Sequence, residues 1–212
     1  MQFLTEEIWF PPVNEATSEG LLAIGGDLSV KRLKLAYQSG IFPWYGDAQP
    51  IMWWSPDPRM VLFPDSLYVS KNLRKKIQKE HFTVTFNKSF KEVIHHCANV
   101  KREDQGGTWI TDEMLTAYTE LHNHGMARSV EVWNGNKLVG GLYGIDLQAQ
   151  RIFCGESMFS LESDASKVAL YYLVQEIRKL KYQFIDCQMY TEHLARMGAR
   201  EIPRSEFLKY LQ

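Results

Sequence analysis

The chain has 212 residues, of which 45% are hydrophobic, and it carries 24 lysines and arginines against 25 aspartates and glutamates. This length suits one domain, or a core domain with a small appendage. The net charge of -1 excludes a protein that holds nucleic acid by bulk charge, so any nucleic-acid site has to be a local patch.

Membrane and redox signals are weak. The longest uninterrupted apolar stretch spans residues 168–174, far short of the ~20 residues of a membrane helix. Cys97, Cys154 and Cys187 lie in apolar segments without short mutual spacing, which favours reduced, buried thiols. We therefore expect a cytoplasmic protein with no membrane partner and no cofactor.

Proline, glycine and tryptophan are dense in the first part of the chain and become rarer after Pro64. This shift predicts a small N-terminal domain over residues 1–64 and a second domain over residues 65–212. In the first, Ser29 can cap a short helix whose apolar face includes Leu33 and Tyr37 and which ends at Gly40. The rest is expected to be loop and short strand.

The second domain begins with alternating helical and extended patterns. Residues 70–79 predict a basic helix starting at Ser70, and residues 82–86 alternate as a strand does. A helix is expected over residues 89–98. Thr111 then caps a helix with acidic residues in its first turn and Gly125 beyond its end.

From residue 128 the pattern predicts a β-hairpin around the turn at 134–136, then a third strand at 151–157. A long amphipathic helix over 163–181, a strand over 183–187 and a short helix over 192–197 follow. We therefore expect an α/β fold with a mixed sheet, whose last two strands are parallel neighbours. A cleft opens where such strands splay.

The sequence contains no motif typical of a catalytic nucleophile or of a metal site. No Gly-x-Ser-x-Gly motif occurs and no cysteine has a recognised nucleophile context. The neighbours His95 and His96 point about 100° apart on a helix, and His122 and His124 do not share a face either. These patterns disfavour a covalent hydrolase and predict no metal site.

A coenzyme A-dependent N-acetyltransferase is the alternative for this strand order. Such an enzyme needs free backbone amides where the third strand enters its helix, to hold a pyrophosphate. The corresponding junction here, residues 156–162, has no glycine after Gly155. The alternative is weakened by this junction.

Five cations occur within residues 71–79, and Lys71, Lys75 and Lys79 fall on one face of the expected helix. A phosphate backbone could follow this face, although a solvated helix has the same pattern. Trp44 and Trp109 lie in loops, where an indole can stack on an unpaired base. We expect Trp53 and Trp54 to pack in the core instead.

Polar residues also end the last expected strand. Alternation places Asp186 and Gln188 on the face opposite Ile185 and Cys187. A buried polar pair is costly without partners or purpose, although hydrogen bonds to a loop would also explain it. Glu156 invites the same interpretation, because a parallel neighbour could bring it near Asp186.

Together these segments resemble the leucyl/phenylalanyl-tRNA-protein transferase family over nearly the whole chain. The matching motifs, in chain order, are GLLAIGGD at 20–27, GIFPW at 40–44, WWSPDPR at 53–59, TWI at 108–110, SVEVW at 129–133, LVGGLYG at 138–144, FCGESMFS at 153–160, DASK at 164–167, IDCQ at 185–188 and GAREIPR at 198–204.

The resemblance implies transfer of Leu or Phe, less readily Met, from aminoacyl-tRNA to a protein with N-terminal Arg or Lys, which marks that protein for degradation. It also implies a small N-terminal domain and a C-terminal N-acetyltransferase-like domain. By position, the implied catalytic pair is Asp186 and Gln188. The implied substrate-binding residues are Trp44, Trp109, Glu156, Leu142, Phe153, Leu173, Ile177 and Ile185, and the implied tRNA-binding residues are Lys71, Arg74, Lys75 and Lys79. Leu142 stands where the family often has Met, and Leu173 and Ile177 where it has Phe.

Overall fold

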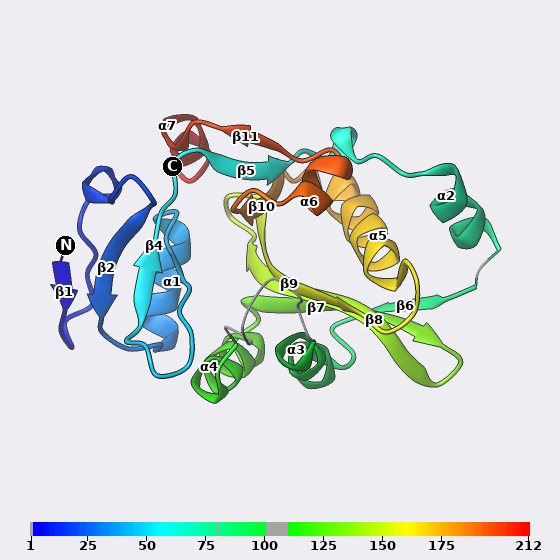
Figure 1. Ribbon diagram of the computed structural model, residues 1–212, viewed down its shortest axis with the longest axis horizontal. Helices are drawn as coiled ribbons and strands as arrows, with labels where there is room; N and C mark the ends of the chain where they lie inside the picture. Colours follow the sequence, from blue (N-terminus) through cyan, green and yellow to red (C-terminus); the bar gives the residue numbers. More distant parts are fainter. Residues whose placement is uncertain (1, 80, 101–109) are drawn as a thin grey trace.

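Two β-sheets organise the described residues, 2–79, 81–100 and 110–212, of the computed structural model (Figure 1). The smaller sheet has the strand order β1-β2-β4-β3. Its strands are β1 (Gln2–Leu4), β2 (Leu21–Gly25), β3 (Phe42–Pro43) and β4 (Met52–Trp54). Helix α1 (Val30–Gln38) belongs to the same part of the chain. The Ser29 hydroxyl accepts the Arg32 backbone N–H, which confirms the predicted cap.

The larger sheet has seven strands in the order β11-β5-β10-β9-β8-β7-β6. Antiparallel pairing joins β7 to β8 and β8 to β9, and parallel pairing joins β9 to β10, as the sequence predicts. The strands are β5 (Arg59–Leu62), β6 (Thr83–Phe86), β7 (Ala127–Asn134), β8 (Lys137–Leu147), β9 (Ile152–Ser160), β10 (Phe184–Gln188) and β11 (Arg200–Ile202).

Helices cover both faces of this sheet (Figure 1). Helix α5 (Ala165–Lys179) lies on one face, and α3 (Phe90–Asn99) and α4 (Asp112–Asn123) lie on the other. Helix α2 (Lys71–Gln78) lies beside α5 and begins after Ser70, close to the predicted start, where the Ser70 hydroxyl accepts the Leu73 N–H. The remaining helices are α6 (Glu192–Arg196), α7 (Arg204–Phe207) and the 3-10 turns at Val13–Glu15, Pro64–Ser66 and Leu208–Tyr210.

Strand β5 precedes residue 64, where the composition shift suggests a domain boundary. It nevertheless pairs with β10 and β11 in the larger sheet. The change from one sheet to the other therefore falls between β4 and β5, a few residues earlier than expected. Composition could not reveal this, because both partners of β5 come late in the chain. Strand β11 and helix α7 were not predicted from the sequence.

The apolar core follows the two faces of the larger sheet. One buried cluster extends from α3 and α4 to α1 and the smaller sheet, and includes the fully buried Trp53. This burial confirms the core position expected for that tryptophan. The other cluster lies between the sheet and α5 and includes Phe153 and Leu173. No helix among the described residues is long and apolar enough to cross a membrane.

Candidate active site

A cavity of about 510 Å³ opens where β9 and β10 part. The two strands pair only as far as Cys154 and Asp186, and β9 then continues without β10. Ligand-binding cavities often form where neighbouring strands separate, and the volume of this cavity is in the usual range for them. The described residues that line it are Phe42, Trp44, Leu142, Tyr143, Phe153, Gly155, Glu156, Ser157, Met158, Leu170, Leu173, Ile185, Cys187, Gln188, Met189, Thr191, His193 and Leu194.

Two β-bulges shape the gap. Strand β8 pairs Tyr143 with Ser157 and Gly144 with Gly155, so Glu156 is the extra residue of a bulge on β9. A Cβ on Gly144 would lie 2.2 Å from the Cys154 carbonyl oxygen, so this bulge requires glycine on the opposing strand.

The second bulge is on β10. Strand β5 pairs Val61 with Asp186 and Met60 with Gln188, so Cys187 is the extra residue. Gln188 has a φ of +65°, in the left-handed region that few residues other than glycine adopt. Backbone outliers of this kind cluster at functional sites, where the surrounding structure holds them in place.

The bulges bring Glu156 and Gln188 together at the cavity wall. Gln188 Nε2 donates a hydrogen bond of 2.7 Å to Glu156 Oε1. This orientation leaves the Gln188 carbonyl oxygen as the group that the side chain offers to a ligand. Tyr118 donates to Glu156 Oε2 at 3.1 Å, and the Tyr118 and Tyr37 hydroxyls share a short hydrogen bond. A hydrogen-bonded chain therefore runs from α1 through α4 to the cavity.

Glu156 is poised to change charge near neutral pH. Burial raises the pKa of its carboxyl from 4.5 to about 7, and the nearby Asp186 charge adds to this, while hydrogen bonds from Tyr37, Tyr118 and Gln188 act in the opposite direction. The pKa values of the Tyr37 and Tyr118 phenols are raised well above 10, also by burial. Both tyrosines therefore remain protonated donors to Glu156.

Asp186 lies beneath the cavity rather than at its surface. The residue is 1% exposed, and Arg59 Nε and Nη2 donate to its two carboxylate oxygens at 2.8 and 2.7 Å. The Gln188 backbone N–H donates to Asp186 Oδ1 at 2.9 Å. Asp186 therefore fixes the backbone that presents the Gln188 side chain. It is also near Glu156, as the parallel pairing of β9 and β10 suggests.

Most of the other expected substrate-binding residues meet at the cavity. Trp44, Leu142, Phe153, Leu173 and Ile185 all line it. Ile177 is an exception: this residue is 1% exposed in the core on α5 and lies outside the cavity lining formed by the described residues. It lies on the same face of α5 as Leu173 but one turn further along the helix, beyond the lining, so its place in the substrate pocket stays a prediction. Trp109 lies outside the described residues.

Several residues of the site are missing from the sequence analysis. Arg59, Tyr37 and Tyr118 hold the site from three different elements, and Phe42 and His193 line the cavity. Arg59 and Phe42 have a sequence signal, because Arg59 ends the WWSPDPR motif and Phe42 lies within GIFPW. Burial, together with the charges of Lys167 and Arg196, lowers the pKa of the His193 imidazole.

The basic helix α2 presents its cations to solvent. Four cations are exposed and form no ion pair with the described residues: Lys71, Arg74, Lys75 and Lys79. Lys76 differs, because it binds Asp164 at the start of α5 at 2.9 Å. The helix therefore has one anchored cation and a surface of free ones.

Cysteine and metal chemistry find little support in the described residues. Burial raises the pKa of the Cys154 and Cys187 thiols, which makes thiolate formation unfavourable, and no disulfide joins the described cysteines. No group of three or more histidine, cysteine, aspartate or glutamate side chains that could hold a metal occurs in the part of the chain that the structure describes.

Comparison with solved structures gives distant similarity. The GCN5-related N-acetyltransferase from Kribbella flavida is 10% identical, with a TM-score of 0.38, over 79% of this chain and 59% of that one. The N-acetyltransferase-like character of the larger domain therefore stays a prediction, whereas the mixed α/β architecture with a smaller N-terminal sheet is confirmed.

Comparison with protein families is more specific. The model described as leucyl/phenylalanyl-tRNA protein transferase matches residues 61–212, and the model of its N-terminal domain matches residues 26–57. Leucyl/phenylalanyl-tRNA–protein transferases from Flavobacterium johnsoniae and Flavobacterium psychrophilum are both 57% identical over 212 residues, covering 100% of this chain and 99% and 100% of those proteins. The relative from Christiangramia forsetii is 54% identical over 100% of both chains. The chain therefore belongs to the leucyl/phenylalanyl-tRNA protein transferase family.

Proposed function

We propose that this protein transfers Leu or Phe, and less readily Met, from aminoacyl-tRNA to the N-terminal Arg or Lys of acceptor proteins in the cytoplasm, which marks them for degradation. The observation that carries this proposal is the Glu156–Gln188 pair at the wall of an apolar cavity. Family membership supports the same reaction class.

The reaction joins an amine to an ester. The acceptor α-amino nitrogen attacks the carbonyl carbon of the aminoacyl ester, the C–N bond forms, and the C–O bond to the tRNA ribose breaks. The acceptor ammonium loses two protons in all, of which one goes to the leaving ribose oxygen and one is released. An α-ammonium has a pKa of ~7.7 to 8.0, so part of it is already a free amine at neutral pH, and orientation can replace a strong base.

Gln188 and Glu156 suit the task of orienting that amine. The Gln188 carbonyl oxygen can accept a hydrogen bond from the amine while Glu156 holds the amide in place from the other end. Glu156, with a pKa of about 7, can also take a proton that the ammonium loses. Asp186 acts through Gln188 as a positioning residue, because Arg59 occupies both of its oxygens.

The charge of the cavity also accounts for the preference for Arg or Lys at the N-terminus of the acceptor protein. A cavity with Glu156 on its wall favours a cationic N-terminal residue over a neutral or acidic one. The donor side chain has apolar partners in Leu142, Phe153 and Leu173. Trp44 also lines the cavity and can stack on the 3′-terminal adenine, and the exposed cations of α2 would hold the tRNA body.

A coenzyme A-dependent N-acetyltransferase is disfavoured by the start of α5. Asp164 precedes this helix and binds both Lys76 and Lys167 at 2.9 Å. As the N-cap residue, Asp164 places a negative charge beside the helix terminus where a pyrophosphate would have to bind. Incubation with radiolabelled leucyl-tRNA, acetyl coenzyme A and a peptide that starts with Arg separates the two activities: transfer of leucine supports the proposal, and transfer of acetyl alone contradicts it.

A further inference from the structure

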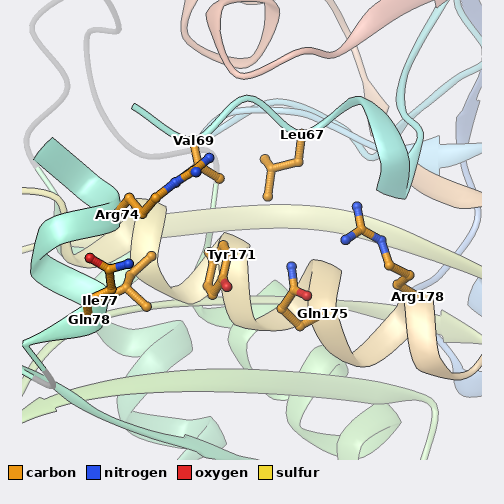
Figure 2. A pocket seen from close by; sticks show the side chains of 8 residues that line it. All are labelled: Leu67, Val69, Arg74, Ile77, Gln78, Tyr171, Gln175 and Arg178. Carbon is orange, nitrogen blue, oxygen red and sulfur yellow. The ribbon is translucent and has the colours of Figure 1, made fainter. Parts of the chain in front are cut away.

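A second hollow lies on the other side of α5. We call it the α2–α5 groove; it has a volume of about 410 Å³ and is lined by Leu67, Val69, Arg74, Ile77, Gln78, Tyr171, Gln175 and Arg178. Arg74 and Arg178 lie at its opposite ends, with Tyr171 and Gln175 between them on α5 and Leu67 and Val69 facing them (Figure 2). The groove therefore combines a centre of apolar, aromatic and amide side chains with a cation at each end.

The two ends differ in how firmly they are held. The Arg178 Nη2 group donates to the Pro64 carbonyl oxygen at 2.6 Å, and its Nε pairs with the 93% exposed Asp65. The Pro64 contact fixes the guanidinium, whereas an ion pair with so exposed a carboxylate contributes little and is readily exchanged. Arg74 is exposed and forms no ion pair with the described residues. Both guanidinium groups can therefore bind an anion.

Helix α5 links this groove to the active site. Leu170 and Leu173 line the cavity at the active site, whereas Tyr171, Gln175 and Arg178 line the α2–α5 groove. At about 100° per residue these two sets fall on different sides of one helix, whose diameter with side chains is about 10 to 12 Å. A large donor whose end enters the cavity can therefore reach the groove by extending past the same helix.

These properties match one unit of a nucleic acid. Each nucleotide in a chain carries a flat base on a ribose that is flanked by two phosphodiesters. The base can stack on tyrosine, and side-chain amides can form hydrogen bonds with its edge. Arginine binds phosphate through its planar fork. The exposed Lys71 and Lys75 on α2 extend the positive surface away from the groove.

We propose that the α2–α5 groove binds one nucleotide of the donor tRNA other than the 3′-terminal adenosine, with its base against Tyr171 and its phosphates between Arg74 and Arg178. This inference rests on the proposed function, because it takes the donor to be a tRNA. It makes α5 a shared wall, with the aminoacyl end on one side and the RNA chain on the other.

The test compares Tyr171→Leu with Tyr68→Leu, a matched control in the same region that is 63% exposed and outside the groove lining. The affinity for deacylated leucine tRNA should fall roughly tenfold in Tyr171→Leu and stay unchanged in Tyr68→Leu, since a base–aromatic stack has about this effect. Transfer from leucyl-adenosine, which lacks the tRNA body, should be unchanged in both variants.

A second variant keeps the test valid if Tyr171→Leu fails to fold. Arg74 and Arg178 are replaced together by glutamine. The logarithm of the tRNA association constant should then fall less steeply with log salt, with a slope smaller in magnitude by about 1 to 2, because two phosphate contacts are lost. Unchanged tRNA affinity and salt slope in these variants would overturn the proposal, as would a higher KM for the acceptor peptide with unchanged tRNA affinity. If the unmodified protein binds tRNA but transfers no leucine, the proposed function fails while the groove is still tested by binding.

Discussion

Arg59 and Asp186 form a two-pronged buried ion pair across β5 and β10. Both side chains are at most 2% exposed, and the guanidinium also donates to the Gly40 carbonyl oxygen at 3.2 Å. The rings of Phe42 and Phe207 lie 4.8 and 4.7 Å from the guanidinium carbon. This pair connects β5 to the backbone that presents Gln188, so structure and activity depend on the same contact.

Removing one member of this pair should be costly. Arg59→Met leaves the Asp186 carboxylate buried without its partner, and we expect the free energy of unfolding to fall by about 3 to 5 kcal/mol. Urea denaturation measures this loss. The control is Arg200→Met on β11, because Arg200 is exposed and stacks on Phe63, and its loss should cost less than about 1 kcal/mol. Equal losses in the two variants would contradict the role of the buried pair.

Stability should depend on pH through Glu156. Its pKa is about 7 in the folded protein and 4.5 in the reference state, so the folded protein holds the proton more tightly. The stabilisation from this proton is complete below pH 4.5 and is lost as the pH rises to about 7. Glu156→Gln removes this dependence. As the pH rises from 5 to 8, the free energy of unfolding of the variant should therefore increase relative to that of the unmodified protein. The same stability difference at both pH values would refute the raised pKa.

The exposed cations of α2 should act on tRNA binding alone. Lys71→Glu, Lys75→Glu and Lys79→Glu together should weaken binding of intact tRNA and flatten its salt dependence, because each cation that contacts a phosphate releases a counterion. Transfer from leucyl-adenosine should survive. The matched control reverses three exposed lysines elsewhere, Lys31, Lys34 and Lys137. If this control weakens tRNA binding equally, net charge explains the effect and the α2 surface is not a specific site.

Donor selectivity should follow the shape of the apolar wall. A methyl branch on Cβ overpacks a narrow pocket at a cost of ~1 to 3 kcal/mol, so Val and Ile should be transferred at least tenfold more slowly than Leu. Leu173→Ala opens the wall and should reduce this discrimination, whereas Ile177→Val changes the core outside the cavity and should not. Competition among Leu-, Phe-, Met-, Val- and Ile-tRNA for one peptide measures the ratios. Equal transfer of Val and Leu by the unmodified protein would rule out this pocket.

Local patterns predicted the elements around the site well. Ser29 and Thr111 cap their helices as expected, because a cap depends on residues three positions apart, and the basic helix begins after Ser70 as expected. Alternation also predicted that Asp186 would lie opposite Ile185, which packs in the cluster beneath α5. Its prediction that Gln188 shares the face of Asp186 is wrong, because the bulge at Cys187 places Gln188 at the cavity with Ile185.

The bulges could not be predicted in this way. A bulge at Glu156 or Cys187 is defined by the register against a neighbouring strand, and no local pattern contains that register. The partners of the site residues are also remote: Arg59 lies 127 residues before Asp186, and Tyr37 lies 81 residues before Tyr118. Their roles follow only from the way the sheets and helices are packed together.

The most direct test of the account is the single-turnover rate of Gln188→Ala and Asp186→Ala with leucyl-tRNA and an Arg-starting peptide, measured beside their affinity for the donor. Gln188 orients the amine and Asp186 fixes the Gln188 backbone, so both variants should lose transfer and keep most of their donor affinity. Unchanged single-turnover rates in both variants would contradict the assignment of Gln188 as the residue that orients the acceptor.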